Sequence, residues 1–212
     1  MPVSDIIQRK LSRRFCRRFL FAPRSASGLF LLGGYMPNQS SRFNQFNNKT
    51  RGSEGGYEDN PKKIDQPTNS GMTGPTLKQY NQAHPNFNFP ENVKDLTSEQ
   101  IDQIYKELFF ENHQIDKIEN DRIAYAIYDM GVMSNFGNVI KTVQKTLNDV
   151  MGRRLTVDGR IGPNTLAALN SIPDDKVDDF MDKLKENRLE YLQGLDTWDK
   201  YGRGWTNRTN RY

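Results

Sequence analysis

The chain has 212 residues, and its positive charge is concentrated at one end: residues 1–35 carry a net +6, and the other 177 residues carry a net −2. A basic isoelectric point that belongs to the N-terminal segment does not make the body of the chain a nucleic-acid binder. A single cysteine excludes an internal disulfide and a Cys-based zinc site, and two histidines without ligand spacing give little support to a zinc hydrolase or a Ser-His-Asp enzyme. An enzyme of this composition has to rely on carboxylates.

Residues 1–35 form a basic N-terminal arm. Its longest apolar runs are far shorter than the ~20 residues that span a bilayer, and Pro23 interrupts any signal-peptide core. Three interpretations stay open: the segment is a basic amphipathic arm that docks on a partner, it is a membrane-surface or export segment, or it is an extension without function. The first is favoured. We expect no transmembrane span and no nucleic-acid partner.

The next stretch combines a weak helix signal with a turn-rich signal. Residues 37–52 contain Phe43 and Phe46 as their only large apolar residues. Their i, i+3 spacing predicts a short, poorly anchored amphipathic helix that stops at the double glycine 55–56. A flexible linker over residues 38–48 is the alternative. Residues 57–75 are rich in Pro and Gly, which predicts a loop with a short β-hairpin and confines β structure to this stretch.

From residue 75 onward the sequence predicts helices. Pro75 opens one of them, and residues 97–100 (TSEQ) form a capping-box pattern before an apolar face of helical period. Further helices are expected from Asp121, over about 137–150, after Gly162–Pro163 and from Pro173 to about Gly194. The fold class is therefore mainly α, with a small loop and hairpin region near residues 57–75.

Two features near the C-terminus have structural interpretations. Residues 158–163 (DGRIGP) suggest a calcium loop but contain too few spaced acids, so a tight turn before a helix is expected. The tail holds aromatic residues amid arginines and could stack on sugars or bases, but packing against the core is the favoured interpretation. We expect no metal and no cofactor.

Glu54 is the candidate catalytic residue. It precedes Gly55, Gly56 and Tyr57 at the expected end of the first helix. The negative end of a helix dipole raises the pKa of a carboxyl group, the more so if Tyr57 shields it from water. An acid still protonated near neutral pH can donate a proton to a glycosidic oxygen. On this local pattern alone, a surface glutamate at a helix stop is the simpler interpretation.

An ordered set of motifs strengthens the catalytic interpretation. Residues 54–61, 68–73 and 128–135 resemble the signature of the lysozyme-like muramidases of glycoside hydrolase family 108, and several later segments resemble the predicted peptidoglycan-binding part of that family. These later segments are residues 143–148 and 157–166, Arg188, Tyr191 and the terminal stretch 204–208. The resemblance covers about residues 40–212 and implies a lysozyme-like, mainly α-helical fold.

The resemblance also implies site residues. Glu54 matches the family's catalytic acid, which cuts the β-1,4 bond after N-acetylmuramic acid. The family's Gly-Gly falls at Asp65-Gln66 here, so the second catalytic group is either Asp65 or Asp59, and the stereochemistry stays open between water activation and a covalent intermediate. Thr68 is expected to hold the attacking water or a sugar hydroxyl. Substrate-binding roles are expected for Tyr57, Asp59, Asn69, Asp129 and Asn135; for Asp129, capping of a neighbouring helix is an equal alternative.

The expected function is thus peptidoglycan hydrolysis. We predict a basic arm over residues 1–35, a polar linker or short helix over 36–52, a catalytic domain over 53–135 and a peptidoglycan-binding portion over 136–212. Enzymes of this kind are common in bacterial viruses, so a virion-associated enzyme or an endolysin that reaches the periplasm and cell wall from the host cytoplasm is expected. The alternative is a non-catalytic peptidoglycan-binding or virion structural protein that retains the fold.

Overall fold

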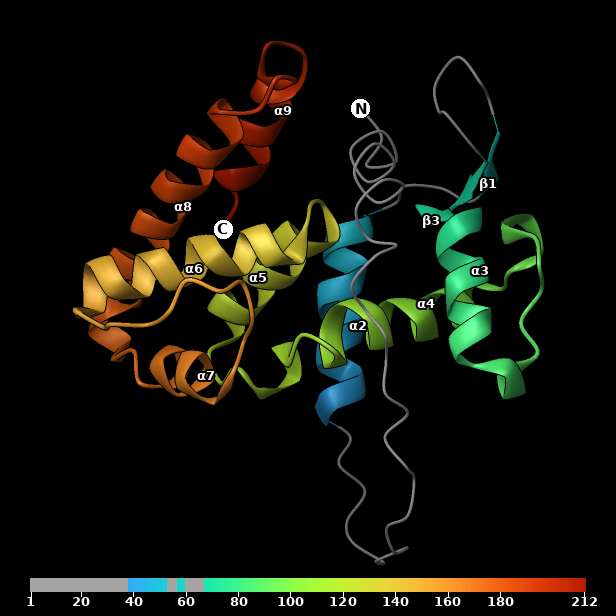
Figure 1. Cartoon of the computed structure of the whole chain (residues 1–212), viewed down its shortest axis with the longest axis horizontal. Coiled ribbons are helices and arrows are strands. Elements are labelled where there is room, and N and C mark those ends of the chain that lie inside the picture. Colours follow the sequence, from blue (N-terminus) through green and yellow to red (C-terminus); the bar gives the residue numbers. More distant parts are fainter. Residues whose placement is uncertain (1–37, 53–56, 60–66) are drawn as a thin grey trace, which may run out of the picture. The chain divides into compact units, whose positions relative to one another are not determined.

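The computed structural model describes residues 38–52, 57–59 and 67–212, and these fall into two compact units, one up to Tyr105 and one from Lys106 onward (Figure 1). The described residues are mainly α-helical with one small antiparallel sheet, which confirms the predicted fold class. None of the described helices is both long and apolar enough to cross a bilayer.

The first unit combines helices with all the β structure of the described residues. It consists of α2 (Asn38–Arg51), β1 (Tyr57–Glu58), β2 (Thr68–Asn69), β3 (Met72–Thr73), α3 (Gly74–Ala83), η2 (Pro85–Phe87), η3 (Val93–Asp95) and α4 (Ser98–Tyr105). The strands pair in the order β1-β2-β3, with Tyr57 opposite Asn69 and Asn69 opposite Met72. The expected confinement of β structure to residues 57–75 is confirmed.

A two-residue turn fixes the register of β2 and β3. Ser70 and Gly71 both have positive φ, at 49° and 83°, as a tight hairpin turn with the twist of the flanking strands requires. Thr73 then caps α3, because its hydroxyl accepts from the backbone N–H of Thr76, and Pro75 occupies the first turn. The hairpin and the helix after it are thus one continuous local structure.

Helix α2 is part of the core of the first unit. Phe43 is 2% exposed, and Phe46, Asn47 and Thr50 are buried as well. The helix prediction is confirmed, whereas the linker alternative and the poor anchoring are wrong, because one face of this polar helix carries two aromatic rings into the core. The helix ends at Arg51 rather than at the double glycine, and Gly52 follows with a φ of 61°.

The capping box at α4 forms as predicted. The Thr97 hydroxyl accepts from the backbone N–H of Gln100 at 3.3 Å, and the Gln100 side chain accepts from the backbone N–H of Thr97 at 3.0 Å. This reciprocal pair satisfies two donors at the start of the helix and fixes where α4 begins.

The second unit is a helical bundle. It contains a π-helical turn η4 (Lys106–Glu111), η5 (Ile115–Lys117), α5 (Asp121–Val132), α6 (Phe136–Met151), α7 (Pro163–Asn170), η6 (Asp174–Lys176), α8 (Val177–Gln193) and α9 (Trp198–Thr209). Helix α6 packs against α5, α7 and α8, and α8 packs against α9 (Figure 1). The predicted helices α5 to α8 are confirmed, and α9 is an additional helix.

The centre of this bundle is a continuous apolar core built by facing helices. Val139, Val143 and Leu147 of α6 are fully buried, as are Phe180 and Leu184 of α8. A close approach at Gly131 brings α5 against the start of α6: a Cβ at this position would lie 2.1 Å from the ring of Phe136. The same ring stacks on His113 at a centroid distance of 3.8 Å.

Candidate functional site

The described flanks of the catalytic candidate are α2 and β1. Glu54 and Asp65 themselves lie outside the described residues, so their predicted roles stay predictions. The chain leaves α2 at Arg51 and enters the sheet at Tyr57, whose side chain is 46% exposed. Asp59 is exposed directly after β1. The four residues 53–56 therefore connect two elements of the first unit.

A polar cluster anchors the C-terminal end of α2 to α4. The Asp102 carboxylate accepts hydrogen bonds from Asn47, at 2.8 Å, and from Arg51. The Arg51 guanidinium also lies over the Tyr105 ring, 5.2 Å from its centroid. Because this cluster ends only three residues before Glu54 in the sequence, it fixes the end of the helix that precedes the candidate catalytic residue.

A second set of contacts anchors the hairpin. The Asn69 side chain donates to the backbone carbonyls of Val93, at 2.8 Å, and Leu96, at 3.2 Å, and the Tyr105 hydroxyl donates to the carbonyl of Ser70 at 3.2 Å. Asn69 and Thr68 are both buried. The amide of Asn69 therefore holds η3 against the sheet, and the expected roles of Asn69 and Thr68 towards substrate or water stay predictions.

Asp129 is the centre of a buried ionic cluster in the second unit. Its side chain is 1% exposed, and it accepts two hydrogen bonds from Arg208, at 2.6 and 2.8 Å, and one from the Tyr212 hydroxyl. These contacts join α5 to α9 and the C-terminus. The carboxylate is engaged with these two partners, and the expected substrate-binding role and its helix-capping alternative both stay predictions.

The protonation of this cluster follows from its burial. Burial alone lowers the pKa of Arg208, but the hydrogen bond and the charge of Asp129 outweigh it and raise the pKa above its ordinary value. Burial, followed by the Asp129 charge, raises the pKa of Tyr212. At neutral pH the guanidinium is charged and the phenol is a neutral donor, so the carboxylate has one ionic and one neutral partner.

Arg188 lies next to this cluster on α8. It is 5% exposed, donates to the Ser134 hydroxyl at 2.8 Å, and lies over the Tyr191 ring at 5.6 Å. Its Nη1 has no hydrogen-bond partner among the described residues, and burial lowers its pKa. Arg188 therefore fixes the junction between α5 and α8, where Ser134 in turn donates to the carbonyl of Met130.

Asn135 has a structural position. Its side chain caps α6 by accepting from the backbone N–H of Asn138 at 3.1 Å, and the Asn138 amide donates to the Tyr191 hydroxyl at 2.8 Å. The side-chain oxygen of Asn135 is thus engaged with the helix that follows it. Its predicted contact with substrate is untested.

The 158–163 segment is a turn held by one glutamine. Gln144 is buried on α6; its amide nitrogen is 2.8 Å from the Asp158 carboxylate and 3.0 Å from the Arg160 carbonyl, and its oxygen accepts from the Gly159 N–H. Gly159 has a φ of 80°, and a Cβ there would lie 2.6 Å from the Gly137 carbonyl oxygen. The structural interpretation of this motif is confirmed. Among the described residues, no group of His, Cys, Asp or Glu side chains could hold a metal ion.

The aromatic tail packs as expected. Tyr201 is buried, and its ring lies 5.8 Å from that of Trp205, which in turn lies 6.3 Å from Trp198. Glycine at position 202 leaves room for the Trp198 ring, which a Cβ would approach to 2.6 Å. Tyr212 is part of the Asp129 cluster. These rings hold α9 in place.

Sequence reasoning missed the two arginine–carboxylate clusters. Asn47 and Arg51 follow Phe43 at intervals of four residues, so all three lie on the same face of α2. This spacing could have indicated that Asn47 and Arg51 face the same neighbours as Phe43. No comparable signal joins Asp129 to Arg208, which lies 79 residues further along the chain.

The helical first unit with its small antiparallel sheet and the helical bundle that follows define the class: a lysozyme-like protein with a second helical portion. Residues 47–137 match the family described as glycosyl hydrolase 108, and residues 138–210 match the predicted peptidoglycan domain. The chain is therefore similar to glycosyl hydrolase family 108 over residues 47–137 and to the predicted peptidoglycan domain over the residues that follow. The boundary between these matches lies inside the second compact unit.

A solved structure is similar over most of the chain. The structure of Brucella abortus SagA superposes with a TM-score of 0.63 at 29% sequence identity, covering 81% of this chain and 91% of that one. No curated protein matches the chain. Together the family matches identify a glycosidase and peptidoglycan hydrolase, with peptidoglycan as its partner.

Proposed function

We propose that the protein is a lysozyme-type muramidase that cleaves the β-1,4 bond between N-acetylmuramic acid and N-acetylglucosamine with Glu54 as general acid. The observation that carries the proposal is the match of residues 47–137 to glycosyl hydrolase 108, because this range contains residues 54–57 (EGGY) and the complete hairpin. The polar composition supports it as well, since carboxylates are the catalytic groups this chain can offer.

The chemistry assigns one step to Glu54. Its carboxyl group donates a proton to the glycosidic oxygen while the bond from that oxygen to the anomeric carbon breaks, and water adds to the anomeric carbon directly or after a covalent intermediate. Asp59 or Asp65 supplies the second carboxylate. Arg51, the cation nearest to Glu54 among the described residues in sequence, is paired with Asp102, so its positive charge is compensated rather than available to keep a neighbouring acid ionised.

The test is digestion of purified sacculi, with mass analysis of the released fragments. The proposal predicts muropeptides that end in a reducing N-acetylmuramic acid, and a loss of at least about 10²-fold in rate for Glu54→Gln, because general acid catalysis contributes about 10²–10⁴-fold. Glu91→Gln is the matched control, since Glu91 is an exposed glutamate of the same unit. Fragments that end in reducing N-acetylglucosamine would contradict the muramidase assignment.

The second catalytic carboxylate can be identified in the same assay. Asp59→Asn and Asp65→Asn are compared, and the anomer of the first product is read by NMR: inversion indicates a water-activating base, and retention indicates a nucleophile. If all three variants digest sacculi as the wild type does, none of the three carboxylates is catalytic. If the wild type binds sacculi and releases no fragments, the non-catalytic alternative gains support; the departure from the family pattern at Asp65-Gln66 motivates it.

We also propose that the basic arm, residues 1–35, docks the enzyme on a virion or tail partner. Its net charge of +6 supports an acidic partner surface. Removal of residues 1–35 should abolish co-sedimentation with virions and leave sacculus digestion unchanged; co-sedimentation that survives the deletion contradicts this role.

A further inference from the structure

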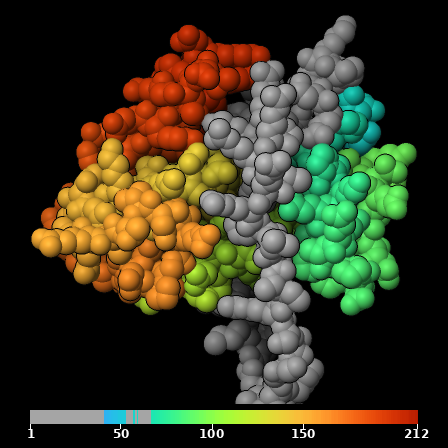
Figure 2. Space-filling model, in the orientation of Figure 1, coloured from blue at the N-terminus to red at the C-terminus, as the bar shows by residue number. Residues whose placement is uncertain are grey.

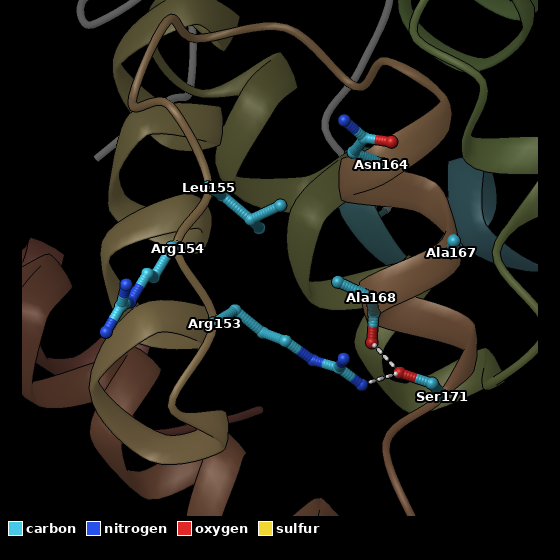
Figure 3. A pocket seen from close by; sticks show the side chains of 7 residues that line it. All are labelled: Arg153, Arg154, Leu155, Asn164, Ala167, Ala168 and Ser171. Atoms are coloured by element: carbon cyan, nitrogen blue, oxygen red, sulfur yellow. Dashed lines mark hydrogen bonds between the residues drawn. The ribbon is translucent and has the colours of Figure 1, made fainter.

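The second unit contains a cavity that none of the roles described above uses. It has a volume of about 410 Å³ and lies between the chain segment after α6 and helix α7 (Figure 3). The residues that line it are Arg153, Arg154, Leu155, Asn164, Ala167, Ala168 and Ser171. Its size is within the range of about 300–1,000 Å³ that is typical of small-ligand pockets. Figure 2 shows α6 and the α7 region, in yellow and orange, together on one face of the molecule.

The charge of this region favours an anionic ligand. Residues 151–172 contain three arginines and a single acid, Asp158. The Asp158 carboxylate is already engaged, because it accepts from the Gln144 amide and from the backbone N–H of Arg160. Helix α7 has no charged residue. Positive charge on one wall therefore faces a neutral wall, and no acid among the lining residues competes for the arginines.

The wall that carries the arginines is fixed before any ligand binds. The side chain of Asn148 on α6 accepts from the backbone N–H of Leu155 at 2.8 Å and donates to its carbonyl at 3.0 Å. Gly152, with a φ of 59°, ends α6 and turns the chain into this segment. A site that is already ordered pays less conformational entropy on binding.

Arg153 is the residue best placed to receive an anion. Its guanidinium reaches across the cavity and donates to the Ser171 hydroxyl at 2.7 Å, and that hydroxyl donates to the carbonyl of Ala168 at 2.9 Å; Arg154 points away from α7 (Figure 3). A guanidinium has five N–H donors in a planar fork that matches a carboxylate. The contact with Ser171 orients the group and uses only one of them.

We propose that this cavity binds a carboxylate of the peptide stems of peptidoglycan, with Arg153 as the anion-binding residue and Ala167, Ala168 and Leu155 contacting the small apolar side chains of the peptide. The inference deepens the proposed function, because it rests on the peptidoglycan assignment of residues 138–210. Peptide stems combine free carboxylates with methyl side chains, which is the combination that an arginine beside alanine residues recognises. The glycan backbone itself offers hydroxyl and acetamide groups.

The test is a titration of the full chain, followed by NMR or calorimetry, with the synthetic tetrapeptide L-Ala–γ-D-Glu–L-Lys–D-Ala and with the same peptide amidated at every carboxyl group. The wild type should bind the acid form at least about tenfold more tightly than the amide, as expected for a charge-assisted hydrogen bond. Arg153→Gln should lose about tenfold in affinity for the acid form, because it removes the charge that pairs with the carboxylate. Equal affinity for both peptides, or unchanged binding by Arg153→Gln, overturns the proposal.

A charge-matched control separates a local contact from general electrostatics. Lys141 is exposed on α6 and makes no hydrogen bond or ion pair with the described residues, so Lys141→Gln should bind within about twofold of the wild type. A parallel titration with a peptide-free chitooligosaccharide should leave the resonances of Leu155, Ala167 and Ala168 unchanged; shifts there instead of with the peptide overturn the assignment in favour of a sugar site.

The two proposals fail independently. Glu54→Gln should bind the tetrapeptide as the wild type does, since this variant keeps all the residues that line the cavity. Hydrolysis of sacculi without binding of the acid peptide defeats the cavity proposal alone. Peptide binding without any hydrolysis defeats the muramidase proposal and leaves the cavity assignment standing.

Discussion

The two units use the same chemical pair, an arginine and an aspartate, in opposite environments. In the first unit the Asp102 side chain is 40% exposed beside Arg51, whereas in the second unit that of Asp129 is 1% exposed beside Arg208. Exposed pairs contribute little to stability, while breaking a buried pair leaves an uncompensated charge. The contrast indicates that the stability of the second unit depends on its buried ion pair. In the first unit the pair contributes little to stability and instead fixes the position of the end of α2.

The largest expected effect is at Asp129. Asp129→Asn should lower the free energy of unfolding by about 3–5 kcal/mol, because Arg208 keeps its charge and loses its partner. Urea denaturation followed by circular dichroism measures this change. The surface variant Asp175→Asn should change stability by less than about 0.5 kcal/mol. Equal effects of the two variants would contradict the contrast between buried and exposed carboxylates.

A neutral buried group should have the next largest effect. Gln144→Ala should cost about 2–4 kcal/mol, because the carbonyl of Arg160, the N–H of Gly159 and the hydroxyl of Thr165 lose a partner. Hydrogen exchange should rise at Gly159, whose amide donates to Gln144. A loss of stability without faster exchange in the 158–163 turn would show that Gln144 acts through packing alone.

His113 should make the free energy of unfolding of the second unit depend on pH. Burial lowers the pKa of His113 to about 4, from 6.5 in an unfolded chain. The folded state therefore binds fewer protons between these values, and stability present above pH 6.5 falls as the pH drops towards 4, by up to about 3 kcal/mol. His113→Phe should flatten the curve of unfolding free energy against pH over this window. An unchanged curve means that His113 is not the responsible group.

The smallest stability effect is expected in the first unit, with a disproportionate effect on activity. Asp102→Asn should cost only about 0.5–1 kcal/mol, since the pair is partly exposed, but it releases Arg51 at the end of α2. Sacculus hydrolysis should fall about tenfold, because small displacements of a catalytic group are costly. Asp95→Asn serves as the control. A fall in activity no larger than that of the control would show that the cluster does not position the catalytic segment.

Local rules in the sequence predicted much of the fold. The capping box at Thr97 and the proline at the start of α3 act within one turn of chain, so their residues identify them directly. The turn at residues 158–163 was equally readable. Helix α9 could not be predicted in this way, because Gly202 and Gly204 disfavour a helix in isolation. The glycine at position 202 is explained only by the structure, in which the ring of Trp198 packs against it.

Less of the candidate site than of the fold could be predicted from the sequence. Asn47 and Arg51 belong to a stretch whose many asparagines suggest a linker, and their partner, Asp102, lies about fifty residues further along the chain. Asp129 stands out as a polar residue on an apolar helix, but its partners come from the last residues of the chain. Single-sequence patterns carry no information on such distant pairs.

The absence of a side chain at Gly131 connects the packing of α5 and α6 to the pKa of His113. Any larger residue there would push the ring of Phe136 away from α5. The imidazole of His113 would then lose the ring that stacks on it. One added methyl group would then leave the His113 ring less buried, which raises its pKa towards the ordinary value. A change in helix packing at this glycine would thus appear first as a change in how the protein responds to mild acid.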